Sequence, residues 1–242
     1  MKKTLIVIFV ILIAGLITYK CSDEPTPVGV ENGEAELLTD KMLDAIGKEK
    51  WDSLAFIQWS FRDKNHYLWD KKNHRAEIKV GGNTVLMDLK DQSGTATANG
   101  KALEGEDKQK ALEEAWKNWC NDSFWLNAPA KVRDPGTTRS IVDMEDETDG
   151  LLVEYSSGGV TPGDSYLWAL DETGLPVYFK MWVSIIPVGG VQASWSDWKD
   201  FNGIKIATTH EMGPMNVNIT NLKVGDTLEE MEREEGYFDM PG

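Results

Sequence analysis

Apolar and polar residues alternate along much of the chain, which is the pattern of β-strands with one face on a core. The alternating runs lie at residues 55–61, 67–69, 76–80, 85–89, 151–155, 166–170, 177–185, 191–195, 204–206 and 215–219. Turn sequences such as Gly81-Gly82-Asn83 separate neighbouring runs, and such short connections require antiparallel pairing. The pattern therefore predicts a curved antiparallel sheet, a half-barrel of about ten strands, in an α+β fold.

Two stretches show helical periodicity instead. Residues 39–50 place Met42, Leu43 and Ile46 on one face and predict an N-terminal helix. Residues 106–120 predict a longer, inserted amphipathic helix, because their apolar residues follow the spacing i, i+3, i+4, i+7, i+8: Leu112, Ala115, Trp116, Trp119 and Cys120. We expect Trp116 and Trp119 to be among the least exposed residues of this helix and to face the concave side of the sheet. A helix packed on a sheet and a lid over a cavity would show the same stripe.

Several strands are also apolar on their second face. The residues concerned are Leu68, Leu86, Leu152, Leu167, Trp182 and Ile186. A fully solvated face would be polar at every second position. Two helices are too few to cover ten strands, so either loops cover the second face or an apolar surface stays open to bind a ligand.

The first 21 residues have the features of a targeting segment. Lys2 and Lys3 precede an uncharged run at residues 5–19, which would span only about 22 Å as a helix. Cys21 follows, at the position of a lipidated cysteine. A bacterial lipoprotein signal usually has a small residue before that cysteine, whereas this chain has Lys20. A lipoprotein, an uncleaved membrane anchor and a secreted protein therefore remain open, and each places the folded part outside the cytoplasm, in the periplasm or at the cell surface.

Residues 22–36 are polar, lack periodicity and predict a flexible tether. Residues 37–225 contain the predicted half-barrel domain. Residues 226–242 include an acidic run and predict a solvated acidic tail or a frayed helix.

The amino-acid composition excludes some classes of protein. The net charge of −15 opposes direct binding to nucleic acid, whose phosphates would be repelled. Two cysteines exclude a disulfide framework, and if Cys21 is lipidated, Cys120 has no partner and is expected to be a buried small residue. A hydrophobic content of 41% is enough for a sizeable core.

We assign no catalytic residue, metal ligand or cofactor, and expect the protein not to be an enzyme. The chain contains none of the common nucleotide-binding, serine-hydrolase or zinc-protease motifs. His66, His74 and His210 are expected to be ordinary strand histidines. The acidic residues of 143–149 only partly match a calcium-binding loop and are expected to form a solvated loop.

The ten tryptophans are the best candidates for ligand binding. Core filling is the ordinary role of such residues. We select as candidates Trp116, Trp119, Trp125, Trp182 and Trp198. Trp182 and Trp198 lie out of phase with the main apolar faces of their strands, which favours a place on a second apolar surface.

An export signal, an N-terminal helix, a large antiparallel sheet and an inserted amphipathic helix together resemble the LolA/LolB-like lipoprotein-carrier superfamily. Short segments also resemble an uncharacterised family of small bacteroidete lipoproteins: Asp122 to Leu126, Gly159 to Asp164, Gly174 to Pro176 and Met181 to Val183. The resemblance implies a half-barrel whose concave side is apolar and receives acyl chains. It implies a membrane-anchored envelope protein that binds a lipid or another hydrophobic small molecule. A structural or interaction lipoprotein with a self-filled cavity is the alternative, and an enzyme acting on glycans is a third.

Overall fold

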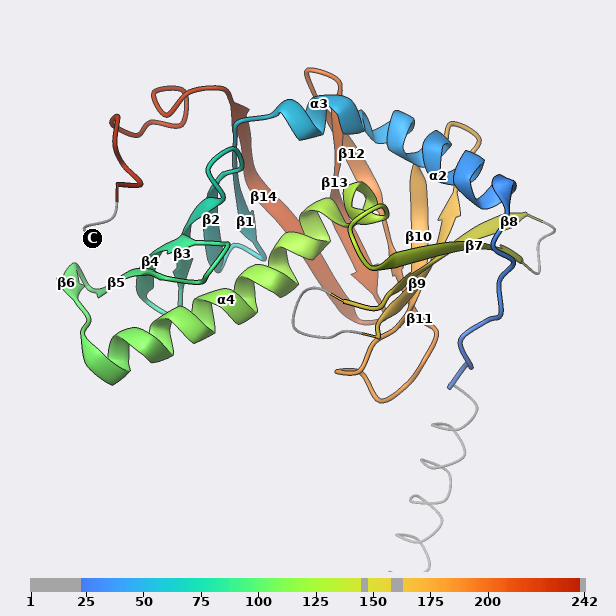
Figure 1. The fold of residues 1–242 in the computed structure, drawn as a ribbon, viewed down its shortest axis with the longest axis horizontal. Helices are drawn as coiled ribbons and strands as arrows, with labels where there is room; N and C mark the ends of the chain where they lie inside the picture. Colours follow the sequence, from blue (N-terminus) through green and yellow to red (C-terminus); the bar gives the residue numbers. More distant parts are fainter. Residues whose placement is uncertain (1–22, 145–147, 158–162, 240–242) are drawn as a thin grey trace, which may run out of the picture.

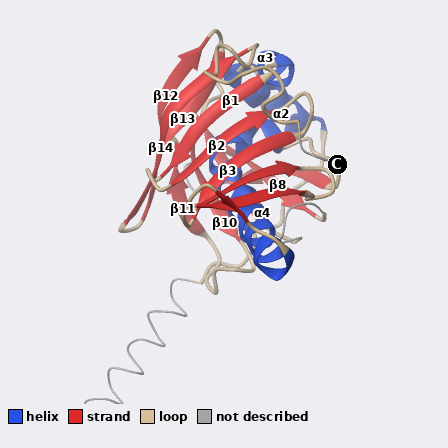
Figure 2. Ribbon diagram, turned by 90° about the vertical axis from the view of Figure 1, so that its left-hand side faces the viewer, coloured by secondary structure: helices blue, strands red, loops and turns tan. Residues whose placement is uncertain are grey.

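The strands form two antiparallel sheets that curve around one long helix, α4 (Figure 1). The computed structural model describes residues 23–144, 148–157 and 163–239. In the second view, the helices gather on one side of the strands (Figure 2). The sheets are curved but not closed. This arrangement confirms the predicted α+β class with a curved antiparallel sheet, an N-terminal helix and an inserted helix.

Among the described residues, the larger sheet has nine strands and the smaller has five. The larger sheet comprises, in spatial order, β12 (Ser196–Phe201), β13 (Ile204–Met212), β14 (Met215–Gly225), β1 (Phe56–Phe61), β2 (Asn65–Asp70), β3 (Arg75–Val80), β4 (Asn83–Asp88), β5 (Gly94–Ala98) and β6 (Lys101–Ala102). The smaller sheet comprises β11 (Val191–Ser194), β10 (Pro176–Trp182), β9 (Ser165–Leu170), β8 (Asp149–Tyr155) and β7 (Thr137–Asp143). Within each sheet, neighbours in sequence are neighbours in space, except that β14 pairs with β1.

The alternation of apolar residues located ten of these strands and missed β5, β6, β7 and β12. Strand β5 has the sequence GTATA, whose small side chains give no apolar signal. The prediction for residues 177–185 was too long, because β10 ends at Trp182 and the chain then leaves the sheet.

The chain passes from the smaller sheet to the larger one at Trp195. Strands β11 and β12 flank this residue, and β11 pairs with β10 whereas β12 pairs with β13. The Trp195 amide donates to the carbonyl of Val177 at 2.7 Å. On the other side, the Glu211 amide donates to the Ser194 hydroxyl at 2.8 Å. One bent segment thus connects the two sheets.

Two helices follow each other at one end of the sheets: α2 (Gly33–Ile46) and α3 (Lys48–Ser53). Gly47 separates them in the left-handed conformation, with φ of 72°. A Cβ atom at Gly47 would lie 1.9 Å from the carbonyl oxygen of Gly203, so only glycine allows this close approach. The Lys50 ammonium donates to the Asn202 carbonyl at 2.8 Å. These contacts hold α3 on the turn between β12 and β13.

Helix α4 (Gly105–Asn127) packs against the larger sheet and continues beyond the predicted range. Trp119 is 6% exposed, but Trp116 is only half-buried, so the burial prediction is correct for Trp119 and wrong for Trp116. The later turns bury Asp122, whose carboxylate accepts a hydrogen bond of 2.5 Å from the Tyr67 hydroxyl. Because that carboxylate is satisfied, the helix can bury a polar residue there. A 3-10 helix, η1 (Ala128–Lys131), follows directly.

The segment after β14 covers the second apolar face of the larger sheet. Met231 is 1% exposed and packs in one cluster with Leu68. The Arg233 guanidinium donates to the Glu77 carboxylate of β3 at 2.9 Å. Residues 226–239 are therefore not a solvated tail, and over this part of the sheet a C-terminal segment provides the cover that the helices do not.

Residues 23–32 also lie on the folded domain, contrary to the flexible tether predicted for residues 22–36. The Glu24 amide donates to the carbonyl of Gly189 at 3.2 Å. Val30 forms a β-bridge with Ile141 of β7. Backbone hydrogen bonds that join distant parts of the chain are not visible in a composition pattern.

Candidate functional site

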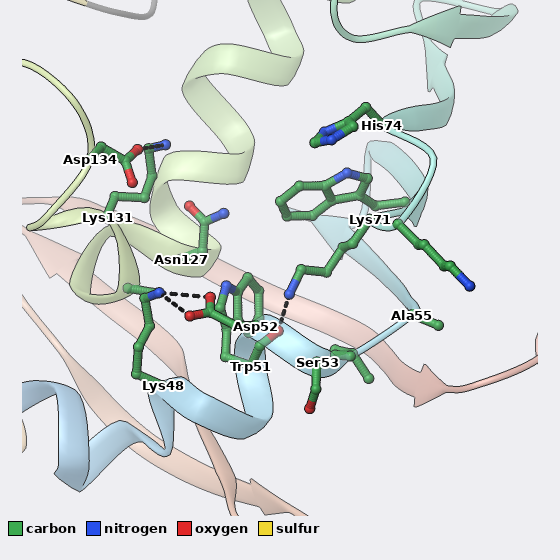
Figure 3. Close-up of a pocket in the computed structure, with 14 residues that line it drawn as sticks. Lys48, Trp51, Asp52, Ser53, Ala55, Lys71, His74, Asn127, Lys131 and Asp134 are labelled. Carbon is green, nitrogen blue, oxygen red and sulfur yellow. Dashed lines mark hydrogen bonds and ion pairs between the residues drawn. The ribbon is translucent and has the colours of Figure 1, made fainter.

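A pocket of about 330 Å³ opens between α3, the turn after β2 and the C-terminal end of α4 (Figure 3). This volume lies at the lower end of the range for small-molecule sites, about 300–1,000 Å³. Its lining residues are Lys48, Trp51, Asp52, Ser53, Leu54, Ala55, Trp69, Lys71, Lys72, His74, Asn127, Ala130, Lys131 and Asp134. Indole rings and lysines dominate this set, so the pocket combines apolar walls with positive charge.

Lys71 lies against the aromatic wall. Its Nζ is 4.2 Å from the centroid of the Trp51 ring and 5.6 Å from that of Trp69. The ammonium also donates to the Trp51 carbonyl oxygen. Asp70 fixes the turn that carries Lys71, because its carboxylate accepts from the amide nitrogen of Asn73 at 3.1 Å.

The Lys71 ammonium lacks a carboxylate partner among the described residues, unlike two other lysines of the pocket. Lys48 pairs with Asp52 at 2.5 Å, and Lys131 pairs with Asp134. Burial lowers the pKa of Lys71 to about 8, although the charge of Asp52 opposes this shift. The lining contains four lysines and two aspartates, so the pocket is locally positive in a chain of net charge −15.

Asn127, the last residue of α4, presents an unsatisfied polar atom. It is 6% exposed, and its side-chain oxygen is buried without a hydrogen-bond partner. In Figure 3 its amide projects between Lys131 on one side and Lys71 on the other. A buried acceptor left without a partner costs about 1–3 kcal/mol. A ligand with a hydroxyl or amide N–H would remove this cost.

Aromatic rings fill the space behind the pocket. Trp69 contacts Trp119 at a ring-centroid distance of 5.2 Å, and Trp119 contacts Trp59 at 5.5 Å. Trp59 then stacks on Tyr67 at 4.8 Å. The indole nitrogens of Trp59 and Trp69 have no hydrogen-bond partner. The inner end of the pocket is thus closed by a cluster of packed aromatic rings.

A second pocket of about 10 Å³ lies nearby, between the start of η1 and β13. Trp195 and Trp198 are among its lining residues. Its volume is no more than that of one water molecule. This second pocket is therefore too small to hold an acyl chain.

The five tryptophans selected from the sequence do not converge on one cavity. Trp119 and Trp125 are buried in the core, where Trp125 packs on Phe179 at 5.7 Å between ring centroids. Trp116 is half-buried on α4. None of these three lines the larger pocket.

Trp182 and Trp198 bond to two separate backbone segments. The Trp182 indole donates to the Glu24 carbonyl at 2.8 Å, and the Trp198 indole donates to the Pro176 carbonyl at 3.2 Å. Neither lines the larger pocket. A ligand-binding role for the five selected tryptophans stays a prediction.

Sequence reasoning missed the residues that do line the pocket. Lys71 belongs to a Lys-Lys-Asn turn and Trp51 follows the helix predicted over residues 39–50, so neither lies in a stretch with a periodic pattern. Asn127 lies 56 residues after Lys71 in the sequence, and no local pattern connects them. An aromatic residue at a helix end near a turn rich in lysine is the one available signal.

Other chemical groups are less suited to a site. Ser60 Oγ lies 2.7 Å from His66 Nδ1, but Ser60 is 2% exposed and lines neither pocket. Burial raises the pKa of the Cys120 thiol to about 11, which disfavours the reactive thiolate. Within the described residues, no group of three His, Cys, Asp or Glu side chains could hold a metal ion.

Residues 145–147 of the acidic loop lie outside the described residues, so the structure does not address calcium binding there. His210 is fully buried, with Nδ1 3.1 Å from the Ser194 carbonyl oxygen, and burial lowers its pKa to about 4. It is a core residue of β13.

Comparison with known proteins finds distant likeness among solved structures. No family model matches the chain, and no curated protein matches it. Among solved structures, the chain is similar to a DUF1329 family protein from Desulfovibrio piger, with 12% sequence identity and a TM-score of 0.41. The match covers 84% of this chain and 96% of that protein.

Proposed function

We propose that the protein is a non-enzymatic envelope protein that binds an anionic amphiphile in the pocket between Lys71 and Asn127. The apolar part of the ligand lies on Trp51 and Trp69. Its negatively charged head group pairs with Lys71, and a hydroxyl or amide of that head group donates to Asn127.

The observation that carries this proposal is that one cavity is lined both by a lysine without an ion pair among the described residues and by an asparagine with an unsatisfied acceptor. Lys71 is a half-buried cation without a carboxylate partner among the described residues, and the side-chain oxygen of Asn127 is a buried acceptor without a donor. Each costs folding free energy in the empty pocket. A ligand that supplies both partners removes both costs at once.

The proposal places the domain outside the cytoplasm and at a membrane. The supporting feature is the apolar run at residues 5–19 followed by Cys21. Anchoring takes place through a lipid on Cys21 or through the uncleaved run itself. Among the described residues, no helix is long and apolar enough to span a bilayer. Nucleic acid is not a partner, given the net charge of −15.

A structural or interaction protein is the second candidate function. Its support is the ring stack from Trp69 through Trp119 to Trp59, which fills the interior that an acyl carrier would leave open. In that case the pocket between Lys71 and Asn127 is a surface feature without a small-molecule ligand.

Titration with lysophosphatidylglycerol tests the two candidates. This probe has one acyl chain, one negative charge and hydroxyl donors. The protein used is residues 23–242, shown by circular dichroism to be folded. The concentration of the probe is kept below its critical micelle concentration. Trp51 and Trp69 line the pocket, so we expect tryptophan emission to shift or quench on binding.

Two further compounds separate the parts of the ligand. Lysophosphatidylcholine keeps the chain and cancels the charge, and glycerol phosphate keeps the charged head and removes the chain. We expect weaker binding for both. Equal binding of lysophosphatidylcholine contradicts the role of charge. Equal binding of glycerol phosphate contradicts an amphiphilic ligand. No response to any of the three favours the interaction protein.

A further inference from the structure

The N-terminal segment is fixed to the loop between β10 and β11. The Trp182 indole donates to the Glu24 carbonyl at 2.8 Å, and Lys180 forms an ion pair with the Glu24 carboxylate at 2.8 Å. The Asp23 carboxylate accepts from the amide of Gly189 at 2.9 Å. Four separate interactions, counting the Glu24 amide on the Gly189 carbonyl, thus hold the first two described residues.

Gly189 allows the loop between β10 and β11 to lie directly against the N-terminal segment. A Cβ atom at Gly189 would lie 2.4 Å from the Glu24 carbonyl oxygen and 2.4 Å from the Trp182 ring. A side chain at this position would push the N-terminal segment away. Further along the segment, a Cβ atom at Gly29 would lie 2.1 Å from the Ser140 hydroxyl. Residues 23–30 therefore follow one defined path along the domain.

The same loop presents an uncharged, apolar surface. Residues 183–190 read VSIIPVGG and contain no charged residue, in a chain that is 27% charged. Ile185 is 70% exposed, which makes it one of the most exposed large apolar residues described. An exposed isoleucine in an uncharged loop suits contact with an apolar surface rather than with water.

The short separation between Cys21 and Asp23 limits how far a membrane can lie from the loop at residues 183–190. Cys21 lies two residues before Asp23, and two extended residues span at most about 7 Å. The apolar run at residues 5–19 lies just before Cys21. Any membrane that holds Cys21 or this run is therefore within a short distance of the loop.

We infer that residues 183–190 contact the lipid bilayer and that Ile185 enters its interfacial region. This inference rests on the membrane anchoring of the proposed function. It does not depend on ligand binding in the pocket. Docking of Glu24 fixes the domain relative to the bilayer, with α3 at the end of the molecule away from this loop (Figure 1). The pocket, which α3 helps to line, therefore lies at the end of the domain away from the membrane that anchors the protein.

A fluorescent probe at the loop tests the orientation. The full chain carries Cys120→Ser and either Ile185→Cys or Leu37→Cys, labelled with the environment-sensitive fluorophore NBD. Leu37 is the matched control, because it is 69% exposed but lies on α2. The proteins are reconstituted in vesicles of phosphatidylethanolamine and phosphatidylglycerol, with and without lipids that carry a doxyl quencher. The parent Cys120→Ser protein gives the background from Cys21.

We expect the probe at residue 185 to show blue-shifted emission and quenching by the doxyl lipid, and the probe at residue 37 to show neither. Gly189→Ala should weaken the quenching at residue 185, because it displaces Glu24. Equal quenching at both positions overturns the fixed orientation. Absence of quenching at both, or protein that does not float with vesicles, overturns the membrane contact. A blue shift at residue 185 without doxyl quenching indicates that the probe is buried against protein, and this result also overturns the membrane contact.

Discussion

Burial deprives the Lys71 ammonium of part of its hydration, and no carboxylate among the described residues forms an ion pair with it. The Trp51 ring and carbonyl oxygen compensate only in part, because burial still lowers the pKa of Lys71 to about 8. Lys48 and Lys131 have acidic neighbours and offer less to a ligand. We therefore expect Lys71 to be the main source of affinity for an anion.

Substitution Lys71→Met keeps the aliphatic stem over Trp51 and removes the charge. A charge-assisted hydrogen bond contributes about 1.5–3 kcal/mol, which corresponds to roughly a 10- to 150-fold loss of affinity for lysophosphatidylglycerol. Lys64→Met is the matched control, since Lys64 is exposed and does not line the pocket. Fluorescence titration measures both. An equal effect of the two substitutions would show that overall charge, rather than this site, attracts the ligand.

The pKa of Lys71 gives a test by pH. Burial lowers the pKa of Lys71 to about 8 in the folded protein, whereas its ordinary pKa of 10.5 applies in the unfolded chain. Between these values the unfolded state binds more protons, so the contribution of Lys71 to folding stability rises with pH. Affinity for an anion should fall over the same window, by at most about tenfold per pH unit for one proton. Affinity that is independent of pH between 7 and 10 contradicts a role for this ammonium.

Helix α4 connects the pocket to the core. Its last residue, Asn127, lines the pocket, and its Trp119 lies within the ring stack behind it. Trp116 lies one turn earlier and is only half-buried. The helix therefore acts as part of the core along one face, rather than as a lid that lifts as a unit.

Trp116 and Trp119 of α4 form a matched pair for measuring how much the buried face of the helix contributes to the core. Trp119→Ala should cost about 3–5 kcal/mol of unfolding free energy, because it leaves a cavity among packed rings. Trp116→Ala should cost about 1–2 kcal/mol, because less apolar area returns to water. Denaturant unfolding of both variants tests the difference. Near-zero cost at Trp119 with loss of ligand binding would instead indicate a lid.

The elements that could be predicted are those whose own side chains carry the signal. Strands such as β3 alternate apolar and polar residues, and α4 shows its stripe, so both were located from sequence. The segment at residues 226–239 could not be placed, because its docking depends on the distant contact between Arg233 and Glu77. Burial would raise the pKa of Glu77, but hydrogen bonds from Tyr237 and Arg233 hold it below its usual value.

At the scale of the whole molecule, the fold separates two ends with different roles. The loop next to residue 23 lies towards the proposed anchor, and the pocket lies near α3. The half-barrel was predictable from the strand pattern. The position of the site was not, because Lys71 and Asn127 meet only when α4 crosses the sheet.

The anchor itself is tested by labelling with palmitate in a bacterial host. We expect labelled palmitate on the full chain and none on Cys21→Ala, because the thiol is the acceptor of the lipid. Membrane association should weaken in the variant. Persistent labelling in Cys21→Ala contradicts lipidation at this residue. Loss of label with unchanged membrane association favours an uncleaved helix at residues 5–19.

The central claim is that the pocket between Lys71 and Asn127 holds an anionic amphiphile. The most direct measurement is a crystal structure of residues 23–242 with lysophosphatidylglycerol at saturating concentration. We expect the phosphate at Lys71, a head-group hydroxyl within hydrogen-bond distance of Asn127, and the start of the acyl chain on Trp51 and Trp69. Lipid bound elsewhere, or an empty pocket at saturation, would contradict it.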